Sequence, residues 1–166
     1  YKSSMLQSKK KSFNQIKIHS QYSICEGALK IENLKEYCKK NKIQSVGLSD
    51  TYNLSGALEF SENISSVGTQ PIIGSQVQFK FKNTYGLIPL IAKNYNGYKN
   101  IIELSSKAYL ENDDNDQPHC SIEDLTKYRD GIIVLSGAIN NLIGNMFNKG
   151  LFEELDELIT ILNNNF

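Results

Sequence analysis

Three side chains that can bind a metal ion or move a proton lie in the first third of the chain. They are His19, Glu26 and Asp50. An imidazole and two carboxylates supply nitrogen and oxygen ligands for a divalent cation. Phosphate chemistry between two or three metal ions requires more ligands than these three. The residues alone therefore predict a polar site that is poor for metal chemistry. A structural role for His19 and a helix-capping role for Asp50 remain open alternatives.

Three further positions of interest carry side chains that are poor metal ligands. Lys17 precedes His19 by two residues, Thr51 follows Asp50, and Gln76 lies further along the chain. An ammonium group at ligand distance repels a metal cation.

The elements that must position these residues alternate between short β-rich runs and longer amphipathic helices. Apolar and polar alternation or continuous apolar runs predict strands at 16–19, 45–50, 71–81, 87–92 and 131–137. Apolar residues at a spacing of three and four predict helices at 31–42, 54–64, 95–110, 139–148 and 151–162, and a short one with a Ser-x-x-Asp start at 121–124.

Two of the predicted strands carry further expectations. The run at 131–137 has four consecutive apolar residues between glycines, which is typical of a parallel strand buried on both faces. In the strand at 87–92, Pro89 favours a sheet edge, and Gly74 predicts a bend or a bulge in the strand at 71–81. This alternation is the pattern of an α/β fold, in which polar residues gather at the carboxyl ends of strands. The sites near 17–26, 50–51, 76 and 136–138 would then share one mouth.

Composition narrows the possible classes of function. The chain has 166 residues, with 18 Lys and Arg against 18 Asp and Glu. A neutral chain has no global field that gathers nucleic acid or anionic lipid. Three Cys and two His are too few for a disulfide framework or a zinc module, so we expect reduced thiols and a cytoplasmic protein. No apolar run reaches the roughly 20 residues of a membrane span, which predicts no membrane partner.

The ends and loops complete the predicted organisation. Residues 1–12 are polar and basic and are predicted to be a disordered or tag-like lead-in. Residues 13–166 are predicted to form one domain. The acidic stretch at 112–117 does not have the spacing of a calcium loop and is predicted to be an exposed loop.

Several segments resemble, in order, the N-terminal PHP (polymerase and histidinol phosphatase) domain of bacterial replicative DNA polymerase III alpha subunits. The matching stretches include Ile16-Lys17-Ile18-His19-Ser20-Gln21-Tyr22-Ser23 with Glu26-Gly27-Ala28, the run 47–60 with Asp50-Thr51, Pro71-Ile72-Ile73-Gly74-Ser75-Gln76-Val77, Leu90-Ile91-Ala92-Lys93-Asn94 with Gly97-Tyr98, Ala108-Tyr109-Leu110 and Gly131-Ile132-Ile133-Val134-Leu135-Ser136-Gly137. The resemblance implies the N-terminal part of a distorted (β/α)7 PHP-type barrel. It also implies that 13–166 is an incomplete PHP domain whose remaining part lies beyond residue 166.

Several residues depart from the motifs of the metal-binding form of this family. Lys17 stands where the metal-binding form has the first histidine of His-x-His, and Thr51 replaces the histidine of Asp-His. Gln76 replaces a glutamate, and Ala138 replaces the cysteine of Ser-Gly-Cys. The resemblance therefore implies a degenerate site with no metal and no catalytic residue. His19, Glu26 and Asp50 are its vestigial positions, and Lys17 is expected to take the place of a cation by pairing with Glu26 or Asp50.

The function implied by the resemblance is that of a scaffold. The parent chain is expected to be a DNA-directed DNA polymerase, with magnesium required only in its polymerase domain and no cofactor in this segment. This segment is expected to dock the proofreading exonuclease subunit, while the sliding clamp and DNA are expected to contact the parent chain.

Two enzymatic alternatives stay open. The first is a metal-dependent phosphoesterase or a 3′–5′ exonuclease acting at the PHP site, and the second is a free-standing histidinol phosphate phosphatase. Both require a metal cluster that activates water.

Overall fold

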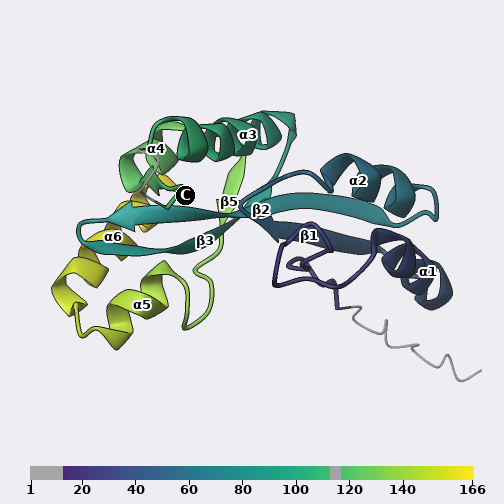
Figure 1. The fold of residues 1–166 in the computed structure, drawn as a ribbon, viewed down its shortest axis with the longest axis horizontal. Helices are drawn as coiled ribbons and strands as arrows, with labels where there is room; N and C mark the ends of the chain where they lie inside the picture. Colours follow the sequence, from purple (N-terminus) through teal and green to yellow (C-terminus); the bar gives the residue numbers. More distant parts are fainter. Residues whose placement is uncertain (1–12, 113–116) are drawn as a thin grey trace, which may run out of the picture.

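The computed structural model describes residues 13–112 and 117–166, which form a mixed sheet covered by helices (Figure 1). The strands are β1 (Ser45–Thr51), β2 (Gln70–Phe81), β3 (Thr84–Ala92), β4 (Cys120–Ser121) and β5 (Ile132–Val134). Their order is β1-β2-β3-β5, and β4 also pairs with β2. β1 and β4 run parallel to β2, whereas the β2–β3 and β3–β5 pairs are antiparallel. The strands and helices together make a mixed α/β architecture.

The helices are α1 (Ile31–Asn41), α2 (Ala57–Ser65), α3 (Tyr95–Leu110), α4 (Ile122–Lys127), α5 (Leu142–Asn148) and α6 (Phe152–Asn165). Local sequence explains most of their bounds. The predicted helix at 95–110 has the same bounds as α3, and Gly150, with φ of 72°, separates α5 from α6. At α4, Ser121 and Asp124 form the predicted capping box.

The apolar residues form two cores at the two ends of the molecule. Figure 1 shows α1 and α2 beside β1 at one end, and α3 to α6 around the β2–β3 hairpin at the other. The smaller core contains Ile31, Leu34, Cys38, Val46, Leu48, Phe60 and Ile64. The larger core includes Phe79, Leu90, Ile101, Leu104, Leu125, Leu142 and Leu158. The middle of β2 lies between them and carries the buried polar residues Ser75 and Gln76.

Two predicted strands differ from the structure. Residues 16–19 make one isolated bridge to the sheet, which pairs Ile18 with Leu48. The run at 131–137 yields only the three-residue β5, which is antiparallel to β3, and Ile133 is 45% exposed. The expectation of a parallel strand buried on both faces was therefore wrong. Gly131 has a positive φ and makes a turn immediately before β5, and the ladder with β3 ends at Val134, so the strand is limited to three residues.

The expectations for Pro89 and Gly74 were also wrong. β3 is not an edge strand, because β5 pairs with its last three residues. The backbone N–H of Leu135, which follows the last residue of β5, donates to the Pro89 carbonyl. The N–H and the carbonyl of one residue in a strand point to the same side, so the N–H that Pro89 lacks would face the end of β5. β2 continues through Gly74 without interruption. A Cβ there would lie 2.5 Å from the Leu90 carbonyl oxygen, so close strand packing explains this glycine.

The predicted helix at 54–64 begins three residues late. The N–H of Ser55 donates to the Asn53 side chain in a local turn, which holds the chain outside the helix until Ala57. The predicted lead-in at 1–12 and most of the acidic loop at 112–117 lie outside the described residues. No helix within 13–112 and 117–166 combines the length and apolar character needed to cross a membrane.

Candidate functional site

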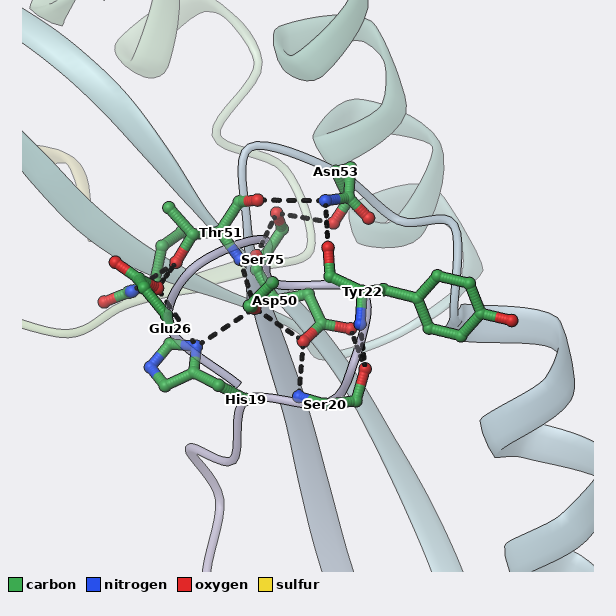
Figure 2. A network of polar contacts seen from close by, with 10 residues as sticks. His19, Ser20, Tyr22, Glu26, Asp50, Thr51, Asn53 and Ser75 are labelled. Atoms are coloured by element: carbon green, nitrogen blue, oxygen red, sulfur yellow. Dashed lines mark hydrogen bonds and ion pairs between the residues drawn. The ribbon is translucent and has the colours of Figure 1, made fainter. Parts of the chain in front are cut away.

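The candidate site lies where the loop 19–27 crosses the carboxyl end of β1, next to the middle of β2 (Figure 2). The isolated bridge between Ile18 and Leu48 attaches the start of this loop to β1, and a second bridge between Ser20 and Leu29 closes the loop on itself. The structure therefore brings His19, Glu26, Asp50, Thr51 and Gln76 together, as the sequence predicts.

Asp50 is the centre of the first half of the site. Its side chain is 1% exposed and accepts three hydrogen bonds. The Ser20 N–H and the Ser23 hydroxyl donate to Oδ1 at 2.6 and 2.7 Å, and the Ser20 hydroxyl donates to Oδ2 at 2.7 Å. The Ser23 hydroxyl also accepts from the Thr51 N–H at 3.0 Å. Hydroxyl and amide donors therefore stabilise this buried carboxylate.

The second half of the site is a chain of hydrogen bonds across β2, β1 and the loop. Gln76 Nε2 donates to Thr51 Oγ1 at 2.9 Å, and the Thr51 hydroxyl donates to Glu26 Oε2 at 2.5 Å. His19 Nδ1 lies 3.8 Å from the same Glu26 oxygen and 3.4 Å from Ser23 Oγ. Figure 2 shows His19 and Glu26 side by side. Thr51 and Gln76 are thus bound to each other where the resemblance places metal ligands.

The expected pairing of Lys17 with a site carboxylate is wrong. Among the ion pairs formed by residues 13–112 and 117–166, Glu26 has His19 as its partner, and none involves Lys17. The reason is that the serines of the loop already cover Asp50. Moving an ammonium group into this buried cluster would require its desolvation.

The residues do not fit a catalytic metal. Both Asp50 oxygens already accept hydrogen bonds, and the Thr51 hydroxyl is directed to Glu26. In the part of the chain that the structure describes, no group of three His, Cys, Asp or Glu side chains is placed to hold an ion. Ser136, predicted near the mouth, instead lines an apolar groove of about 550 Å³ with β5 and α6.

The site also contains residues that the sequence argument did not single out. Ser20 and Ser23 bind Asp50, which lies 30 and 27 residues further along the chain, and nothing in their own segment indicates this partner. Tyr52 adopts φ of 65° and donates to Gln78 Oε1 at 2.6 Å. Burial raises the pKa of Tyr52, and the charges of Glu26 and Tyr109 raise it further. No local pattern indicates this tyrosine.

The other side of the loop is fixed to α2. The Tyr22 hydroxyl donates to Glu59 Oε2 at 2.6 Å, and this bond is the main cause of the raised pKa of Tyr22. Asn53 Nδ2 donates to the Tyr22 carbonyl at 2.9 Å. Gly56 must lack a side chain, because a Cβ there would lie 2.7 Å from the Tyr22 ring. The loop is therefore held from both sides.

Fold and site together define a mixed α/β domain with a hydrogen-bonded polar site at a strand end. The PHP domain model matches residues 15–166, and the chain belongs to this family.

Relatives named DNA polymerase III subunit alpha share this segment. The chain is 37% identical over 133 residues to the protein from Rickettsia felis, 33% over 150 residues to that from Haemophilus influenzae and 36% over 154 residues to that from Borreliella burgdorferi. These matches cover 80%, 89% and 86% of this chain. They cover only 11%, 13% and 13% of the relatives, so the chain spans a small part of their length.

Proposed function

We propose that the chain is the PHP segment of a replicative DNA polymerase alpha subunit and acts there as a non-catalytic scaffold. The names and identities of the relatives support the replicative context. The saturation of Asp50 by three donors is the observation that carries the non-catalytic role. A carboxylate with both oxygens engaged and no imidazole beside it at Thr51 is a poor ligand for a metal that activates water.

The scaffold would serve partners rather than a substrate. We propose that it docks the proofreading exonuclease subunit, and that the sliding clamp and DNA contact the parent chain. Polymerisation, with its magnesium ions, would belong to other domains of that chain, in the cytoplasm. The neutral charge of this segment agrees with a role in protein contacts, because it supplies no general attraction for DNA.

Metal content and hydrolysis test the non-catalytic role. Emission spectrometry on purified protein, after soaking with zinc, manganese or iron salts, should find no stoichiometric metal. Phosphodiester substrates should remain uncleaved. The double variant Lys17→His/Thr51→His serves as the positive control and should bind metal more tightly, because it restores two imidazoles at the site. Tightly held metal in the wild type, together with cleavage that chelators abolish, would favour the phosphoesterase or exonuclease alternative.

A pull-down tests the docking role. The chain, immobilised, should retain the exonuclease subunit from the same organism at micromolar concentrations or below. An unrelated neutral protein of similar size serves as the control. If this chain does not retain the exonuclease but the rest of the alpha subunit does retain it, the docking surface lies outside this segment.

A further inference from the structure

We propose that Gln76, Thr51 and Glu26 form a hydrogen-bonded clasp that holds separate elements together, as the metal of a metal centre would. A metal in a strand-end site joins its ligands from separate elements, and the clasp joins β2, β1 and the loop 19–27 with hydrogen bonds alone. This inference rests on the proposed function in one respect, which is that the site holds no metal. We name these three residues the clasp.

The direction of each hydrogen bond in the clasp is determined by the single proton of Thr51. This hydroxyl lies 2.5 Å from a Glu26 carboxylate oxygen, which can only accept, so Thr51 must donate to it. Thr51 must then accept from Gln76, and this requirement fixes Nε2 rather than Oε1 of the amide toward Thr51. Each bond therefore depends on the next one, and the three residues act as a unit.

The clasp leaves Gln76 Oε1 buried with no partner among the described residues. Gln76 is 3% exposed, and an unpaired acceptor at such a site is unfavourable. The side chain therefore does not satisfy its own hydrogen-bonding needs in this position. Its contribution is the bond to Thr51, which agrees with a role in holding the loop.

The clasp and the Asp50 cluster hold the loop at two points. Ser20 and Ser23 bind Asp50 on one side, and Glu26 binds Thr51 on the other. Between these points Cys25 adopts φ of 65°, a conformation that a non-glycine residue keeps only when the surrounding contacts hold it. The neighbouring Ile24 is 84% exposed. Two attachments thus keep a strained turn in place and direct an apolar side chain outward.

Hydrogen exchange tests the clasp in the intact protein. The N–H groups of Glu26 and Gly27 donate to the Ser23 carbonyl, so their exchange rates report how often the turn opens. Thr51→Val should raise these rates by roughly fivefold or more, because residues in one hydrogen-bond network are strongly coupled. Thr51→Ser keeps the hydroxyl and should exchange like the wild type, which separates loss of the bond from a general loss of folding.

A double-variant comparison distinguishes the clasp from independent contacts. Glu26→Ala should raise the rates to a similar extent, and Glu26→Ala combined with Thr51→Val should add little to either change. Glu36→Ala, which removes an exposed glutamate on α1, is the matched control and should leave the loop unchanged. Additive effects of the two clasp variants would overturn the proposal.

A chelator arm separates this proposal from the proposed function. Loop exchange in the wild type should not change with EDTA. If EDTA raised it as much as Thr51→Val does, a metal would be holding the loop, and both proposals would fail. If EDTA had no effect but the variants were additive, only the clasp would fail.

Discussion

Replacing Asp50 with asparagine tests whether the buried negative charge stabilises the domain. The substitution keeps the shape of the side chain but removes the charge that three donors share. It also directs an NH2 group at Ser20 Oγ, which already accepts from the Tyr22 N–H at 3.2 Å. The Ser20 hydroxyl then has no carboxylate oxygen to which it can donate.

The expected loss of stability follows from these bonds. A hydrogen bond to a charged group contributes roughly 1.5–3 kcal/mol, and one between neutral groups roughly 0.5–1.5 kcal/mol. Converting three charged bonds to neutral ones therefore removes about 3 kcal/mol. Asparagine offsets part of this loss, because it avoids burying a charge at a site that is 1% exposed. We expect Asp50→Asn to lower the free energy of unfolding by about 2 kcal/mol on this balance.

Urea denaturation of the wild type and the variant at neutral pH measures this difference. Asp156→Asn on the exposed face of α6 is the control and should change stability by less than about 0.5 kcal/mol. If Asp50→Asn were equally benign, the reasoning would be refuted. The carboxylate would then serve something other than the fold, and metal binding would return as an explanation.

Three further predictions concern other parts of the structure. Burial raises the pKa of Asp124, but the hydrogen bonds of its capping box and a nearby ammonium outweigh it and lower the pKa overall. Asp124 therefore contributes stability above its unfolded pKa near 4, and this contribution is lost as the pH falls through its lower folded-state pKa; Asp124→Asn should reduce the loss of stability below about pH 4 in acid titrations. A thiol reagent should label the exposed Cys25 in the native protein but neither Cys38 nor Cys120, because burial raises the pKa of both, to about 12 for Cys120; rapid native labelling of either would contradict their packing. Gly97→Ala should destabilise the fold by at least about 2 kcal/mol in thermal denaturation, since its Cβ would lie 1.8 Å from a backbone carbonyl oxygen.

Features with local causes could be predicted from the sequence. The capping box of Ser121 and Asp124 and the break at Gly150 depend on residues within one turn of each other. The meeting of Asp50 and Thr51 with Gln76 follows the predicted grouping of polar residues, but Gln76 lies in the middle of β2, level with Thr51 at the end of the parallel β1, and not at a strand end. Pattern and spacing were enough for the capping box and the break.

Features that depend on distant contacts could not be predicted. Ser20 and Ser23 bind a carboxylate that lies 30 and 27 residues away, and nothing in their own segment indicates this partner. The wrong prediction for Lys17 has the same origin. Charge alone favours an ion pair with Asp50, but Ser20 and Ser23 from the loop already donate hydrogen bonds to this carboxylate. The apolar run around Ile133 indicates a strand, but which of its faces is covered depends on the elements that pack there.

The single strand β2 takes part in both cores, and this limits how the chain can be divided. Its first half pairs with β1 near the smaller core, and its second half carries Phe79 and Phe81 into the larger one. At about 3.3 Å per residue, its 12 residues span about 40 Å. A boundary drawn between the two groups of apolar residues would cut this strand. A shortened version designed for biophysical work must therefore keep residues 70–81 whole, even if it is meant to represent only one end of the molecule.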